Sequence, residues 1–253
     1  MTNTEHMSPE VIMFAGDWHG NTAWAQESIE IAYAKGATVI VHVGDLGFYP
    51  QYTQRFLQPI HKTLHELNMK LYFVDGNHEH FEYLYSFPIQ HDGFRKITST
   101  VYHIPRGHVW EWQGRRFLGL GGAHSVDKQS QLLTKSWFVE EKITQYDVEQ
   151  SIKNATGTID FMVTHDSPVG VNTPLSSMYI SEIDLYDAYD NRKLLGTVVD
   201  AVKPRTLIHG HYHEYYEDMK PNTSTRIIGL DRDGSTFRWN RHLVNLKTLE
   251  ELD

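Results

Sequence analysis

Five places in the chain set Asp, Asn or His directly after a short apolar run. These places are Gly16-Asp17-Trp18-His19-Gly20, Gly44-Asp45, Asp75-Gly76-Asn77-His78-Glu79, His165, and Gly210-His211-Tyr212-His213. Carboxylate and imidazole donors suit manganese, iron, zinc or nickel, whereas calcium and magnesium favour mostly oxygen donors. At least seven residues of these segments can act as donors, which is too many for one tetrahedral ion. The set therefore predicts two divalent metal ions that share a bridging carboxylate.

The elements that must position these donors follow an alternating pattern. The apolar runs before them, each typical of a buried strand, are Val11–Ala15, Thr38–Val43, Lys70–Val74, Ile159–Thr164 and Thr206–His209. Apolar residues at helical spacing separate the first three runs, in Thr22–Lys35 and Tyr52–Asn68, which indicates βαβ units and a parallel sheet. Ligands of open α/β sheets lie beyond the carboxyl ends of the strands, so all five polar segments can converge at one edge.

The middle of the chain has a different pattern. The short runs Val101–Ile104, His108–Trp112 and Arg115–Leu120 are separated by turn residues and favour antiparallel strands. Trp137–Lys153 and Asn191–Val202 predict helices, and shorter strands are expected at Tyr212–Glu217, Arg226–Leu230 and Ser235–Asn240. Between them, residues 169–190 have no clear period and predict a loop or cap insertion. With no repeat or linker, residues 1–253 are expected to form a single domain.

Composition excludes several classes of protein. The chain has 253 residues and no cysteine, so a disulfide scaffold and a thiolate zinc site are ruled out. Its net charge is −9, and no dense run of Lys and Arg is present, so stable nucleic-acid binding is not expected. No apolar run approaches the roughly 18 residues of a membrane span, and the N-terminus lacks signal-peptide features. A cytoplasmic protein without membrane association is therefore expected.

The ordered set of motifs resembles the calcineurin-like metallophosphoesterases, and the segment Gly119–Lys128 is similar to a stretch of their small bacterial and phage members. The resemblance implies an α/β fold, a four-layer α/β/β/α sandwich of two mixed β-sheets flanked by helices. It also implies two divalent ions, with Mn²⁺ the first choice and Fe, Zn or Ni as alternatives. The residues that it assigns are Asp17, His19 and His213 on the first ion, Asn77, His165 and His211 on the second, Asp45 between them, and His78 beside them as a group that contacts phosphate or protonates the leaving group.

Two departures from the family pattern bear on the substrate. Members that dephosphorylate proteins carry Val-Asp-Arg-Gly soon after the second Gly-Asp, but this chain reads Gly44-Asp45-Leu46-Gly47-Phe48. The phosphate-binding Arg is therefore missing, and Phe48 stands where relatives have the Asp that orients the catalytic His. The candidates to replace the Arg are Arg106, Arg115 and Arg116, and the placement of His124 in core, surface or pocket stays open.

The resulting expectation is a binuclear phosphoesterase. It would hydrolyse small phosphodiesters, with cyclic nucleotides or 2′,3′-cyclic phosphates as candidates, and/or phosphomonoesters by a metal-activated hydroxide. Asp45 and His78 are the predicted catalytic residues, and Asn77 and His78 are predicted to contact the substrate. The alternatives are a Ser/Thr protein phosphatase and, from another class, a scaffold with the same fold. The oligomeric state does not follow from the sequence.

Overall fold

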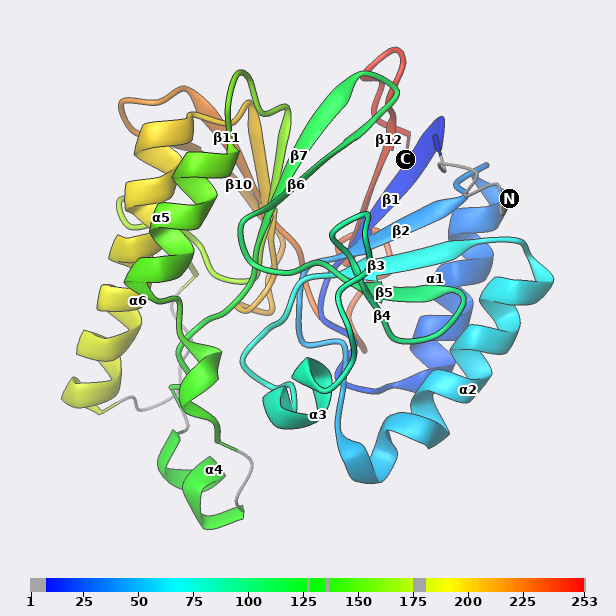
Figure 1. The fold of residues 1–253 in the computed structure, drawn as a ribbon, viewed down its shortest axis with the longest axis horizontal. Helices are drawn as coiled ribbons and strands as arrows, with labels where there is room; N and C mark the ends of the chain where they lie inside the picture. Colours follow the sequence, from blue (N-terminus) through cyan, green and yellow to red (C-terminus); the bar gives the residue numbers. More distant parts are fainter. Residues whose placement is uncertain (1–7, 127, 135–136, 175–180, 253) are drawn as a thin grey trace.

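The computed structural model describes residues 8–126, 128–134, 137–174 and 181–252 (Figure 1). Among these residues the strands form two six-stranded mixed sheets. The order in the first sheet is β12 (Arg241–Asn245), β1 (Val11–Ala15), β2 (Val39–His42), β3 (Lys70–Phe73), β5 (Val101–His103) and β4 (Arg95–Lys96). The order in the second sheet is β10 (Tyr216–Lys220), β11 (Thr225–Gly229), β9 (Thr206–His209), β8 (Phe161–Thr164), β7 (Arg115–Leu120) and β6 (His108–Trp112).

The centre of each sheet is parallel and its edges are antiparallel. In the first sheet β1, β2, β3 and β5 run parallel, while β12 and β4 pair antiparallel at the two edges. In the second sheet β11, β9, β8 and β7 run parallel, while β10 and β6 pair antiparallel. Strands buried on both faces are apolar at successive positions, as Ile12, Met13 and Phe14 are in β1.

Helices cover the outer face of each sheet (Figure 1). The helices are α1 (Thr22–Ala34), α2 (Pro50–Glu66), α3 (Phe81–Tyr85), α4 (Lys128–Thr134), α5 (Gln145–Asn154) and α6 (Glu182–Val202), with a 3₁₀ turn at Val139–Glu141. One apolar cluster joins the first sheet to α1 and α2, through residues such as Met13 and Ile29. A second lies between the sheets, around Phe14 and Phe117, and a third joins the second sheet to α5 and α6, around Met162. The predicted four-layer sandwich is therefore confirmed.

Several predicted boundaries were wrong for local reasons. The helix expected over Trp137–Lys153 begins at Gln145, because Thr144 and Asp147 form a capping box there. The insertion expected over residues 169–190 is helical from Glu182 onward, because Ser181 caps α6 by accepting from the Asp184 backbone N–H. Residues 175–180 of that insertion lie outside the described residues. The strand expected at Ser235–Asn240 is instead a series of turns that leads into β12.

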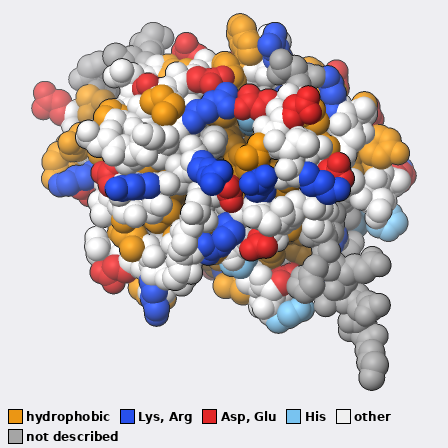
Figure 2. Space-filling view, turned by 90° about the horizontal axis from the view of Figure 1, so that it is seen from above, with side chains coloured by type: hydrophobic (Ala, Val, Ile, Leu, Met, Phe, Trp, Pro, Cys, Tyr) orange, Lys and Arg blue, Asp and Glu red, His pale blue; other side chains and the backbone are white. Residues whose placement is uncertain are grey.

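Charges at the amino ends of the parallel strands are paired. Ion pairs join Glu10 to Lys247 and Asp160 to Arg205 at this end of the sheets. Figure 2 looks onto the molecule from above and shows Lys and Arg side chains lying among Asp and Glu. The unusual cluster of acids and histidines lies at the opposite, carboxyl end of the strands. No helix in the described part of the chain is long and apolar enough to cross a membrane.

Candidate metal centre

Both sheets contribute side chains to one edge of the molecule. The segments after β1, β2 and β3 come from the first sheet, and those after β8 and β9 come from the second. Because parallel strands end at the same edge, all five polar segments lie at the junction of the two sheets. The structure thus brings the seven predicted metal ligands together in two clusters, with His78 beside the first.

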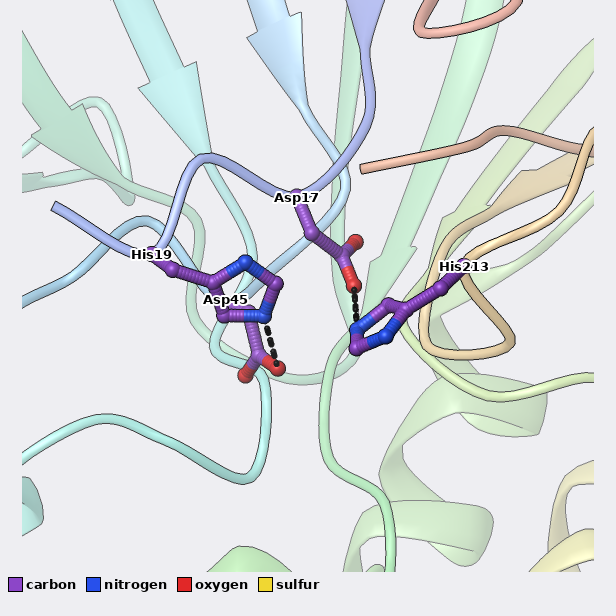
Figure 3. A group of neighbouring side chains, drawn as sticks. All are labelled: Asp17, His19, Asp45 and His213. Atoms are coloured by element: carbon purple, nitrogen blue, oxygen red, sulfur yellow. Dashed lines mark ion pairs between the residues drawn. The ribbon is translucent and has the colours of Figure 1, made fainter. Parts of the chain in front are cut away.

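The first cluster consists of Asp17, His19, Asp45 and His213 (Figure 3). Each of the four offers one donor atom, and these atoms all lie within 4.8 Å of one another. His19 Nε2 lies 3.6 Å from Asp45 Oδ2, and His213 Nε2 lies 3.3 Å from Asp17 Oδ2. The carboxylates are buried, whereas the His19 and His213 side chains are 26% and 39% exposed, so this cluster is open to solvent on its histidine side.

The second cluster centres on His165, which is buried together with Asn77 and Asp45. Its Nε2 atom lies 3.0 Å from Asn77 Oδ1 and 3.3 Å from Asp45 Oδ1. The ring of His211 lies beside it, with the two ring centroids 5.0 Å apart. Because Nδ1 of His165 donates to the Val43 carbonyl at 2.9 Å, its Nε2 atom is the one left to face the oxygens. Asp45 takes part in both clusters, one carboxylate oxygen in each.

The charges of the two clusters depend on one another. Burial opposes the charged form of His165, but Asp45 and Asp17 outweigh it and raise the pKa of this histidine to about 10. Burial likewise opposes the charged form of His19, yet its bonds to Asp233 and Asp45 raise the pKa to about 11. For Asp45, nearby His165 and other histidines overcome burial and hold the carboxyl pKa well below its usual range. Protons on two histidines thus balance the buried carboxylates, and a bound cation can take their place.

The backbone of the site is held in a rarely used conformation. His19, Asp45, His211 and His213 have φ angles of 45°, 53°, 71° and 55°. Residues other than glycine seldom adopt this left-handed region, and each instance costs about 1–3 kcal/mol. Four strained positions in one site indicate that side-chain direction there takes precedence over local backbone stability.

Backbone N–H groups fix the two carboxylates. The N–H of His211 donates to Asp17 Oδ2 at 3.1 Å, and the N–H of His78 donates to Asp45 Oδ1 at 2.9 Å. Gly76 allows the close approach of the second pair, because a Cβ atom there would lie 2.1 Å from Asp45 Oδ1. Both carboxylates are therefore fixed before any ion binds.

Comparison with protein families agrees with this geometry. The model of the calcineurin-like phosphoesterases matches residues 11–215, a range that contains every predicted site residue. The chain belongs to the calcineurin-like phosphoesterase family. Its members are metal-dependent hydrolases of phosphoric esters, and the predicted family and enzyme class are confirmed. Among curated protein sequences, none matches this phosphoesterase significantly.

Solved structures share the fold of the phosphoesterase at low sequence identity. The protein TT1561 of Thermus thermophilus is 13% identical over 96% of this chain and 97% of that one, with a TM-score of 0.59. A dimetal phosphatase from Danio rerio is 11% identical over 94% of this chain and 93% of that one, also with a TM-score of 0.59. At such identities the likeness is one of fold.

The donors of the phosphoesterase fit the divalent metals that its family uses. Two carboxylates and two imidazoles in the first cluster are a suitable set for a transition metal ion. In the second cluster, once His165 gives up its extra proton, its Nε2 atom and the oxygens of Asn77 and Asp45 are all acceptors that face one another. Without a proton or a cation among them these lone pairs repel, so the geometry suits a bound cation.

The surroundings of His78 follow from the sequence departures. Phe48 is fully buried and stacks on Tyr83, so it packs in the core and offers His78 no polar partner. Among the described residues, the His78 ring makes no hydrogen bond, and its centroid lies 6.1 Å from that of His19. The role of His78 as an acid stays a prediction.

The three arginines proposed to replace the missing one are bound elsewhere. Arg106 donates two hydrogen bonds to Asp75, while Arg115 donates to the Leu246 carbonyl and Arg116 to the Thr156 carbonyl. His124 is fully buried. None of the three guanidinium groups is free to bind a phosphate at the clusters.

Sequence reasoning missed two carboxylates that hold the site together. Asp233 Oδ1 accepts from His19 Nδ1 at 2.9 Å, and it follows β11 just as the predicted donors follow their strands. The same rule of polar residues after strand ends, applied to one more strand, could have found it. Glu79, quoted only as part of a motif, accepts from the backbone N–H groups of Leu46 and Gly76 and so ties two site loops together.

Proposed function

We propose that this phosphoesterase hydrolyses small phosphodiesters and/or phosphomonoesters at a binuclear metal centre. Cyclic nucleotides and 2′,3′-cyclic phosphates are the candidate diesters. The observation that carries the proposal is that two donor clusters, each with residues from both sheets, share the carboxylate of Asp45. The proposed ions are Mn²⁺, with Fe, Zn or Ni as alternatives, held by Asp17, His19 and His213 in the first site, by Asn77, His165 and His211 in the second, and by Asp45 in both.

Hydrogen bonds within the protein orient two of the histidines for metal binding. Nδ1 of His19 donates to Asp233, and Nδ1 of His165 donates to the Val43 carbonyl, so both rings keep Nε2 for an ion. Two divalent ions bound there would supply an activated water and offset the charge of the phosphate oxygens. His78 lies next to the first cluster, and its ring makes no hydrogen bond within the described part of the chain, which supports contact with phosphate and protonation of the leaving group.

The loop after Asp45 supports a small substrate. Leu46 and Phe48 are fully buried, so this loop packs into the core where protein phosphatases carry an Arg. A phosphomonoester dianion therefore lacks the bidentate guanidinium contact that would favour it over a diester. The name of the Danio rerio relative, a dimetal phosphatase, is the reason to keep monoesters in the proposal.

The test compares two chromogenic esters on the Mn²⁺-loaded protein. Turnover of bis(p-nitrophenyl) phosphate well above that of p-nitrophenyl phosphate is expected, and it would justify a panel of cyclic nucleotides. The opposite ratio, together with turnover of phosphopeptides, would support the Ser/Thr protein phosphatase. Absence of turnover of both esters by protein that contains two ions per chain would support the scaffold and overturn the proposal.

A further inference from the structure

The side chain of Asn77 can turn either of two ends toward the second cluster. Its amide oxygen can bind a cation, whereas its amino group can only donate hydrogen bonds. In the structure Oδ1 lies 3.0 Å from His165 Nε2, and Nδ2 donates to Ser125 Oγ at 3.0 Å. Asn77 is buried, so neighbouring protein groups decide which end faces the cluster.

Ser125 has one hydroxyl proton, and it is donated in a hydrogen bond to a neighbouring carboxylate. The hydroxyl donates to Glu141 Oε2 at 2.6 Å. Because a carboxylate only accepts, the proton of Ser125 is directed away from Asn77. The free lone pair of Oγ then faces Asn77 and accepts from an amino group, while an amide oxygen in that place would be repelled.

Glu141 is itself fixed by donors at its other oxygen. Oε1 accepts from the Ser125 backbone N–H at 3.0 Å and from Trp137 Nε1 at 2.9 Å. His124 lies between Glu141 and the first turn of α6, with Nδ1 3.4 Å from Oε1 and Nε2 3.2 Å from Asp184 Oδ1. Ser125, Glu141 and His124 are all fully buried, so these contacts are shielded from water.

The backbone of the same segment lies directly against the loop that carries Asn77. The N–H of Gly122 donates to the Asp75 carbonyl at 2.8 Å. At Gly121 a Cβ atom would lie 2.4 Å from the same carbonyl oxygen, so only glycine permits this approach. The segment that resembled small family members on sequence thus has a structural task beside the metal centre.

We propose that Ser125 and Glu141 are positioning residues that set the direction of the Asn77 amide, so that its oxygen faces the second ion. This inference rests on the proposed role of Asn77 as a ligand. Glu141 accepts a hydrogen bond from the Ser125 hydroxyl, and Ser125 in turn accepts one from Nδ2 of Asn77. Oδ1 of Asn77 is then left to bind the ion. The direction of two hydrogen bonds determines which atom the ion meets.

A near-isosteric substitution can reverse this direction. In Glu141→Gln the oxygen must stay at the Oε1 position, because two N–H donors point at it. The amino group then faces Ser125, which turns its own proton toward Asn77. Asn77 must then turn its oxygen toward Ser125 to accept this hydrogen bond, and its amino group faces the second ion.

The experiment measures Mn²⁺ binding at each site, by metal content per chain, by titration calorimetry and by electron paramagnetic resonance of the ion pair. Glu141→Gln is expected to bind the first ion as the wild type does and the second ion about 10–100-fold more weakly. The matched control is Ser151→Ala, which removes another buried hydroxyl, bonded to the Asp147 carbonyl, and leaves Asn77 untouched. Thermal melting of each variant confirms that it is folded.

A second substitution separates positioning from structural support. Adding Asn77→Asp to Glu141→Gln gives a side chain that accepts the Ser125 proton with one oxygen and binds the ion with the other. The double variant is therefore expected to regain the second ion, which repair of general stability would not achieve. If Glu141→Gln itself fails to fold, Ser125→Ala removes the same acceptor and is expected to weaken the second ion alone.

The outcomes distinguish this inference from the function on which it rests. A wild type with two ions and a Glu141→Gln variant that binds both as tightly would overturn the inference and leave the proposed function in place. A double variant that stays as weak as Glu141→Gln would also overturn it. A wild type that binds fewer than two ions would overturn the binuclear centre and the inference together.

Discussion

The two halves of the candidate metal centre orient their ligands by different means. The first half is partly open to solvent, and His19 is oriented by Asp233, which lies in a turn after β11. In the second half Asn77 and His165 are buried, and Asn77 is oriented by Ser125 and Glu141 in the protein interior. In the first half, water can replace a missing hydrogen-bond partner. Around Asn77 in the second half, protein groups must supply every hydrogen bond.

This difference shows that one fold can orient the ligands of a shared metal centre in two ways. A histidine needs only one hydrogen bond to fix its tautomer and its ring, and a single carboxylate provides that bond. An asparagine needs a defined direction of hydrogen bonding, which takes a chain of groups. We therefore expect substitutions around each half to affect one ion and spare the other, while the shared carboxylate affects both.

The largest effect is expected at the shared carboxylate. Asp45→Ala removes an oxygen from each cluster, so both ions should be lost and the rate with either ester should fall by a factor of about 1,000 or more. Metal content and steady-state turnover measure this. His78→Ala is the contrast, since its ring is no proposed ligand: two ions should remain while the rate falls. An Asp45→Ala protein with wild-type turnover would show that the site is misassigned.

A smaller and selective effect is expected at Asp233. Asp233→Ala leaves Nδ1 of His19 without its acceptor, so affinity for the first ion should fall about 10–100-fold while the second ion is spared. Calorimetric titration with Mn²⁺ measures both affinities. Glu214→Ala, which removes an exposed carboxylate next to His213, controls for the change of charge. Equal weakening of both ions would contradict the division of the centre into two separately supported halves.

An effect on stability, not on metal affinity, is expected in the pH dependence of the metal-free protein. The pKa values of His165 and His19 are raised to about 10 and about 11, so the folded protein binds more protons than the unfolded chain above about pH 6.5. Their stabilisation is complete below that pH and is lost as pH rises through the folded values. His211, whose burial lowers its pKa to about 4, titrates below this window.

Melting temperature in chelator should therefore fall steadily between pH 7 and pH 10. Bound Mn²⁺ replaces these protons, so the loaded protein should lose most of this slope. A shift of 1 kcal/mol corresponds to roughly 2–4 °C for a protein of this size, which thermal scanning resolves. A metal-free protein whose melting temperature stays level over this range would contradict the proton balance between the clusters.

Much of the fold could be predicted because its signals are local. The runs that became β1, β8 and β9 are apolar and bounded by polar turns, so strand ends and the residues after them were read directly. Trp110 and Trp112, in the run His108–Trp112 expected to be a strand, are both buried in the core. The start of α5 was missed because the apolar pattern already begins at Trp137, before the helix. Only the side-chain cap formed by Thr144 shows where the helix begins.

The supporting groups of the site could not be predicted, because they depend on contacts across the fold. Asp233 lies 214 residues from His19, and Ser125 lies 48 residues from Asn77. A buried carboxylate such as Glu141 looks like any exposed one in the sequence, until the structure shows which donors surround it. Donors follow from residue type and strand ends, but their orientation follows from tertiary packing.

The most direct test of a shared carboxylate is electron paramagnetic resonance of the protein titrated with Mn²⁺, together with metal analysis. The account predicts two ions per chain and, at full loading, a spectrum of two magnetically coupled ions, as expected when both bind Asp45. A single ion per chain, or two ions with the spectrum of isolated Mn²⁺, would contradict a centre built around Asp45.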